Sequence, residues 1–120
     1  MTEEEVIITR ALYHFAEKLR YVAEDDEIKE LRDIAIEDIK NEIKKAEELG
    51  SMISAQSEEK IKIPASKSYI ESVLDVYIND IYLAIEKIPE KVGTKLSFEK
   101  LNKEVEGAVS IKRNLGKYLD

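Results

Sequence analysis

His14, the sole histidine of the chain, is the first candidate for chemistry. A metal ion held on a helix needs a second ligand three or four residues away. Glu17 is the only such residue here, and Lys18 would oppose a cation. The chain has no cysteine, which excludes disulfides, thiolate metal sites and cysteine nucleophiles. We therefore expect His14 to lie on the surface or at the rim of the protein and to bind no metal.

Arg10 and His14 stand one helical turn apart in the pattern Arg-x-x-x-His. In this they resemble the arginine and histidine pairs of some helical RNases, although those families use a wider spacing. We prefer the simpler interpretation, in which both side chains are solvated on the same face of a helix.

Carboxylates are the only plentiful reactive groups, with 26 Asp and Glu residues among 120. Glu27 and Glu30 form a Glu-x-x-Glu pair, and Glu71 and Asp75 lie one helical turn apart. These pairs distantly resemble the Mg²⁺ ligands of all-α nucleotide pyrophosphohydrolases of the MazG type. The resemblance implies a Mg²⁺-dependent phosphohydrolase of nucleotides as the alternative function. The second pair departs from the family's Glu-x-x-Asp pattern, and Glu27 falls at the start of a helix rather than inside one.

Other catalytic signatures are missing. The sequence has no glycine-rich phosphate loop and no Gly-x-Ser-x-Gly elbow. In a chain with so many acids, carboxylate pairs also arise by chance. We therefore expect a protein that is not an enzyme and that needs no cofactor.

Charge is unevenly divided along the chain. Residues 1–59 contain 17 acids and 8 bases, whereas residues 60–120 contain 9 acids and 11 bases. The net charge of −7 argues against broad, non-specific coating of nucleic acid. The basic residues gather in two places, around an extended segment at residues 61–64 and at the end of the chain: Lys60, Lys62 and Lys67, and Lys112, Arg113 and Lys117. If they meet, they could contact phosphates or an acidic partner, but the last three also suit the negative end of a helix dipole.

Apolar spacing predicts about four amphipathic helices in a single all-α domain covering residues 1–120. The first helix should begin at Thr2, which forms a capping box with Glu5. The second should run over about 27–49 and stop at a left-handed Gly50. Residues 51–67 should be irregular or extended. The third helix should run over 68–88 with a Ser68–Glu71 capping box, and Ser97 should cap the fourth.

The expected third helix is unusually apolar. Besides its main stripe it carries Tyr69, Val76 and Leu83 at seven-residue spacing. Such a helix should be central in the bundle or should meet a partner. We therefore expect a small helical interaction module, a subunit or adaptor of a larger and possibly nucleic-acid-processing assembly, that docks on protein or on itself. The predicted partner-binding residues are Lys60, Lys62, Lys67, Tyr69, Val76, Leu83, Lys112, Arg113 and Lys117.

The expected location is the cytoplasm, away from membranes. No apolar run is long enough for a transmembrane helix, and the start of the chain lacks the features of a signal peptide. The abundance of Lys, Glu and Ile, with one glutamine, hints at a thermophilic source.

Overall fold

The computed structural model describes residues 2–55, 62–87 and 95–119. Within these residues the protein is all-α, as predicted. It has five α-helices, where the sequence predicts about four, and it also has two short 3-10 helices. In chain order they are α1 (Glu3–Glu24), η1 (Asp26–Ile28), α2 (Lys29–Ile34), α3 (Ile36–Ala55), α4 (Lys67–Lys87), α5 (Lys95–Arg113) and η2 (Leu115–Lys117).

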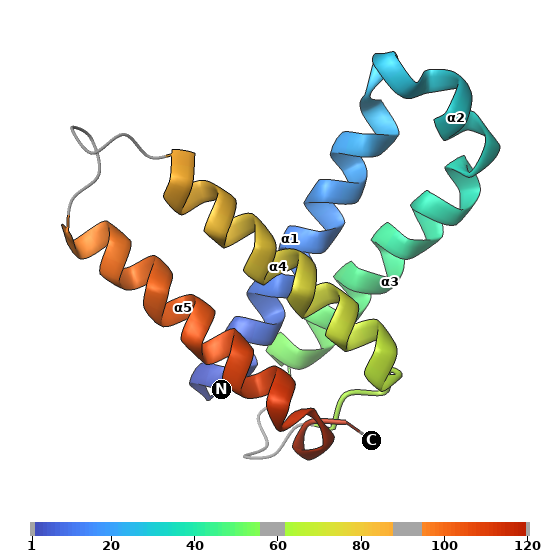
Figure 1. Cartoon of the computed structure of the whole chain (residues 1–120). Coiled ribbons are helices and arrows are strands. Elements are labelled where there is room, and N and C mark those ends of the chain that lie inside the picture. The colour runs from blue at the N-terminus through green and yellow to red at the C-terminus, as the bar shows by residue number, and fades with distance from the viewer. Residues whose placement is uncertain (1, 56–61, 88–94, 120) are drawn as a thin grey trace.

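The helices form two antiparallel hairpins that cross near one end of each (Figure 1). The first hairpin consists of α1 and α3, joined through η1 and α2, and the second consists of α4 and α5. Helix α1 packs against α3, α4 and α5. The central helix is therefore α1. Of the two alternatives for the apolar third helix, a central position or contact with a partner, the first is wrong.

The predicted capping box starts α1. The Thr2 hydroxyl accepts a hydrogen bond from the Glu5 backbone N–H at 3.2 Å, and the Glu5 carboxylate accepts one from the Thr2 N–H at 3.1 Å. Two backbone donors that an isolated helix leaves unpaired are thereby satisfied.

The predicted helix over 27–49 is interrupted. Residues 26–28 form η1, and a break at Ala35 separates α2 from α3. The break has a topological reason: α1 ends at Glu24, and α3 must return along it, so the chain turns within the intervening residues. Arg32 donates a hydrogen bond to the Asp25 carbonyl across this turn. Helix α2 has no buried residue, and its apolar side chains, Leu31 and Ile34, are exposed.

Gly50 does not end a helix, so that prediction is wrong. Helix α3 continues to Ala55, and no glycine in the described residues has a positive φ. A Cβ atom at Gly50 would lie 3.0 Å from Cζ of Tyr13. The glycine on α3 therefore leaves room for the Tyr13 ring of α1. Gly107 plays a similar part on α5, because a Cβ there would lie 2.6 Å from Cδ1 of Ile7. Both glycines let a neighbouring helix approach closely.

Two further cap predictions are wrong. Helix α4 begins at Lys67, and the Ser66 hydroxyl, not that of Ser68, accepts a hydrogen bond from a first-turn backbone N–H, that of Tyr69. Ser68 lies inside the helix, where its carbonyl accepts a bond from Ser72. Ser97 likewise lies inside α5, which begins at Lys95.

The extended segment predicted before α4 is present in part. Ile63 forms an isolated parallel bridge with Leu119, and its N–H donates to the Tyr118 carbonyl at 2.7 Å. Ile63 is 1% exposed and belongs to the core. This bridge fastens the start of α4 to the end of the chain. Residues 60 and 61 lie outside the described residues.

The core is concentrated where the hairpins cross. Buried residues of α1 lie between Glu5 and Ala16, and those of α3 lie between Ile43 and Ile53. The 3-10 helix η1 and helix α2 have no buried residue. The radius of gyration is 15.7 Å, against roughly 13.5 Å expected for a domain of this length. Each hairpin therefore extends away from the shared core. No described helix has both the length and the apolar character to span a membrane.

This division of the core predicts unequal costs for the same substitution. Leu12→Ala should lower the free energy of unfolding by about 2–5 kcal/mol, because Leu12 is fully buried. Leu31→Ala should change it by less than about 0.5 kcal/mol, because Leu31 is 72% exposed. Urea denaturation followed by circular dichroism measures both values. Equal losses would contradict the position assigned to the core.

Candidate docking surface

A stripe of polar side chains joins the two hairpins. Arg10, His14 and Lys18 follow one another at four-residue spacing on the face of α1 turned toward α4 and α5. Each binds a carboxylate from the other hairpin. The stripe ends at Lys18, the last residue of α1 with a polar contact to α4 or α5 among the described residues.

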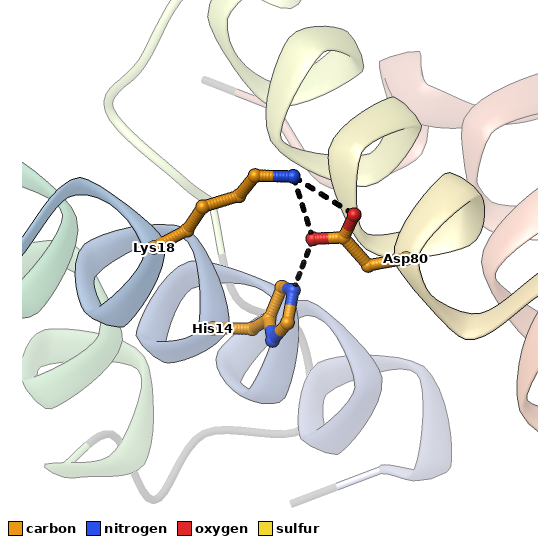
Figure 2. Close-up of polar contacts among 3 residues, drawn as sticks. All are labelled: His14, Lys18 and Asp80. Carbon is orange, nitrogen blue, oxygen red and sulfur yellow. Dashed lines mark hydrogen bonds and ion pairs between the residues drawn. The ribbon is translucent and has the colours of Figure 1, made fainter. Parts of the chain in front are cut away.

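Asp80 on α4 is the partner of both His14 and Lys18 (Figure 2). One carboxylate oxygen lies 2.7 Å from His14 Nε2, and Lys18 Nζ donates to both oxygens at 2.8 and 3.0 Å. Partial burial by itself raises the pKa of Asp80. The hydrogen bonds and positive charges of Lys18 and His14 outweigh that effect, so the pKa lies below its ordinary value.

Glu104 on α5 joins the stripe at the other end. The Arg10 guanidinium donates to both of its oxygens, at 2.9 and 2.7 Å, and the Tyr77 hydroxyl donates at 2.8 Å. Burial, followed by the hydrogen bond and charge of Glu104, raises the pKa of Tyr77. The rings of Tyr77 and His14 lie 5.5 Å apart, which links the two clusters.

The stripe is suited to holding helices together rather than to catalysis. His14 lies at the rim, with 39% of its side chain exposed, but its Nε2 is bound to Asp80. The hydroxyl nearest to the imidazole in this network, that of Tyr77, is already bound to Glu104. Arg10 and His14 are directed to different carboxylates, so they do not converge on one point as a catalytic pair must.

Beyond this stripe the hairpins separate and leave apolar side chains uncovered. Tyr21 follows Lys18 by one turn on the same face of α1, and Leu83 follows Asp80 by one turn on α4. They are 75% and 41% exposed. On the second hairpin, Tyr82 is also 50% exposed. Part of the additional apolar side chains of α4 is therefore exposed at the outer end of this helix.

The tip of the first hairpin carries the most exposed apolar residues. Leu31 is 72% exposed and Ile34 is 84% exposed. They stand on α2 among carboxylates: residues 24–38 contain eight acids and two bases. We call this segment, with Tyr21, the acidic tip. The outer end of the second hairpin, residues 79–87 of α4 and 98–103 of α5, has no excess charge. Its three lysines, Lys87, Lys100 and Lys103, are balanced by three acids, Asp80, Glu86 and Glu99.

The two predicted groups of basic residues are partly brought together. The bridge at Ile63 places Lys62 beside the chain end, where its Nζ donates to the Leu119 carbonyl at 3.4 Å. Lys67 pairs with Glu71 at 3.8 Å on its own helix. Lys112 pairs with Asp75 on α4, while Arg113 and Lys117 are exposed. Lys60 lies outside the described residues.

The predicted stripe Tyr69, Val76 and Leu83 does not form one exposed surface. Tyr69 is half-buried, meets Phe15 edge-on and has Lys45 4.0 Å above its ring. Burial, followed by the charge of Glu42, raises its pKa to about 12. Val76 is half-buried as well, so only Leu83 is exposed.

The four carboxylates of the alternative function lie on separate hairpins. Glu27 and Glu30 belong to the acidic tip, whereas Glu71 and Asp75 lie on α4 and pair with Lys67 and Lys112. In the parts of the chain that the structure describes, no three side chains of His, Cys, Asp or Glu come together in a way that could hold a metal ion.

Sequence reasoning missed Tyr21, Leu31, Ile34 and Tyr82. Leu31 and Ile34 fit the apolar stripe of a single long helix, so the pattern assigned them to the core. The sequence offers one signal for this tip, the run of acids at Glu24–Glu27. It interrupts the apolar pattern and can end one helix and cap the next.

Replacing Asp80 tests the polar stripe. Asp80→Asn should lower the free energy of unfolding at pH 7 by up to about 1 kcal/mol, since its cationic partners are partly exposed. Because folding lowers the pKa of Asp80, its ionised form stabilises the fold above the unfolded-state pKa, and this stabilisation is lost as pH falls through the lower folded-state value. The gap between wild type and variant should therefore close in acid. Denaturation curves from pH 7 to pH 2 measure it, and a gap constant with pH would contradict the role given to Asp80.

Comparison of the chain with models of protein families, with characterised proteins and with solved structures finds no match.

Proposed function

We propose that the protein is a helical interaction module without enzymatic activity, a subunit or adaptor that docks on protein through the outer ends of its hairpins. One observation carries the proposal. Five large apolar side chains (Tyr21, Leu31, Ile34, Tyr82 and Leu83) are exposed at the two ends that point away from the core.

Exposed apolar side chains at the acidic tip are suited to protein contact. Fully burying a side chain such as Leu or Ile contributes roughly 1.5–3 kcal/mol. Tyrosine is among the residues that most often dominate the energy of an interface. The surrounding carboxylates supply the polar rim that such interfaces have. Regular helices carry these groups, so little conformational entropy is lost when a partner binds.

A role within a nucleic-acid-processing assembly fits the charge pattern only indirectly. Phosphates would be repelled by the acidic tip. The exposed bases at the opposite end, Lys62, Arg113 and Lys117, are the described groups best suited to phosphate contact. In such an assembly we expect the module to bind protein through its hairpin ends and to approach nucleic acid with the surface near η2.

The double substitution Leu31→Ser and Ile34→Ser tests the docking function. It should leave the melting temperature nearly unchanged, because both residues are exposed. It should abolish retention of any protein that the immobilised wild-type chain captures from extracts. The matched control is Leu19→Ser with Ile39→Ser, which changes the same residue types at half-buried positions that pack against the core. Those changes should lower stability, while the fraction that stays folded keeps its binding. Equal capture by wild type and tip variant would contradict docking through this tip, as would a wild-type chain that captures nothing and also stays monomeric at every accessible concentration.

The alternative function, a Mg²⁺-dependent nucleotide phosphohydrolase, yields a distinct expectation. A ligand that binds only the native state raises the melting temperature. Because the four carboxylates are divided between the hairpins, Mg²⁺ or Mn²⁺ at millimolar concentration should leave the melting temperature unchanged. A metal-dependent rise that the Glu27→Gln, Glu71→Gln variant loses would favour the enzyme instead.

A further inference from the structure

We infer that the partner of the acidic tip is a basic amphipathic segment of another protein, in which lysine or arginine side chains flank a few apolar residues. The inference rests on the proposed docking function and adds the chemistry of the partner. An exposed apolar pair on α2 supplies the contact. The unpaired carboxylates beside it determine the charge of the segment that can cover it.

Leu31 and Ile34 are the apolar part of this surface. They lie three residues apart on α2, so they share one face of the helix. Leu31 is 72% exposed and Ile34 is 84% exposed. No residue of α2 is buried, so a partner can cover both side chains without displacing any part of the fold. Covering them removes apolar surface from water, which favours association.

Unpaired carboxylates flank the apolar pair. Between residues 24 and 38 the chain has eight acids and two bases. Five of the acids are exposed and form no ion pair with any described residue: Glu24, Asp26, Glu27, Glu30 and Asp38. Of the two bases, Arg32 is partly buried and lies 3.7 Å from the Asp33 carboxylate, which leaves Lys29 as the one exposed base between residues 24 and 38. The charge available to a partner is therefore strongly negative.

Helix ends account for only part of this negative charge. An acid is favourable in the first turn of a helix, where Glu30 lies in α2 and Asp38 lies in α3. An acid is unfavourable in the last turn, yet α1 ends at Glu24 and has no base in its last turn. The acidic tip therefore keeps negative charge that its own helices do not balance, and a cationic partner can balance it.

A divalent metal ion does not fit these carboxylates. Throughout residues 24–38, which the structure describes without a gap, the acids form no group that could hold a metal ion. Phosphates of nucleic acid or lipid would be repelled. Lysine and arginine side chains spaced along a polypeptide can meet separated carboxylates one by one, while apolar residues between them reach Leu31 and Ile34. Charges at the rim then give specificity and speed association, and the apolar contacts supply most of the affinity.

Selection from a random peptide library tests the chemistry of the partner without assuming it. Peptides of about four helical turns, displayed on phage, are selected on the immobilised full chain. Peptides that also bind the Leu31→Ser, Ile34→Ser variant are removed. The peptides that remain should carry a net positive charge and contain apolar residues. If none remains, the inference is wrong, whereas the docking function is decided separately by capture of a folded partner from extracts.

Charge variants of the chain test how a selected peptide binds, with its affinity measured by fluorescence anisotropy. Glu27→Gln with Glu30→Gln should weaken binding about tenfold, because two exposed ion pairs are lost. The matched control, Glu86→Gln with Glu106→Gln, removes the same charge from exposed positions on the second hairpin and should leave the affinity unchanged. Raising the salt from 0.1 M to 1 M shortens the screening length from about 10 Å to about 3 Å. It should therefore weaken binding to the wild-type chain more than binding to the Glu27→Gln, Glu30→Gln variant.

Three outcomes would overturn the inference, and they separate it from the proposed function. Equal weakening by the two pairs of charge substitutions would mean that overall negative charge, and not the acidic tip, attracts the peptide. Neutral or acidic peptides that require Leu31 and Ile34 would reject the basic partner and leave docking through the tip supported. A wild-type mass that rises with concentration in sedimentation equilibrium, with a monomeric Leu31→Ser, Ile34→Ser variant, would identify a second copy of the chain as the occupant instead.

Discussion

The need for α1 to serve two sets of neighbours is the constraint on which the rest of the structure depends. One side of α1 packs along α3, and another meets α4 and α5. Three neighbours can approach one helix closely only where side chains are small, and Gly50 and Gly107 stand opposite Tyr13 and Ile7 of α1. The second face is not wholly apolar, because Arg10, His14 and Lys18 run along it. Their carboxylate partners on α4 and α5 make this mixed contact favourable.

The position of the crossing determines which apolar residues are covered. Where helices overlap, Ile8, Leu12 and Leu74 are fully enclosed. Past Lys18 on α1 and Asp80 on α4, Ile81 is still buried, but Tyr21 and Leu83 face water. Leucine thus has different roles at Leu12 and Leu31. Burial of the side chain would be favourable at both positions, but only Leu12 is buried by other residues of the same chain.

Features that depend on residues close together in the sequence could be predicted. Features that depend on contacts between residues far apart in the sequence could not. The Thr2–Glu5 capping box, the helical class and the extended segment at Ile63 depend on local spacing. The break at Ala35 and the role of Gly50 depend on where α1 ends and where Tyr13 lies, which no local pattern encodes. For the same reason His14 was placed at the rim but Asp80, 66 residues away, was not identified as its partner. The exposed tip was assigned to the core because periodicity reveals an apolar face without revealing what covers it.

The hydrogen bond between Arg10 and Glu104 spans 94 residues of sequence, and this separation bears on how the chain folds as it is synthesised. The hairpin of α1 and α3 is complete once residue 55 has left the ribosome, so it can form from contacts of short range. The face of α1 that contacts α5 can be covered only after α5 has been synthesised. During that interval Ile7 and its neighbours face solvent, although in the finished protein Ile7 is only 8% exposed. The nascent chain therefore presents a second apolar surface that the folded protein lacks. This surface is covered once α5 has emerged and Leu119 can pair with Ile63.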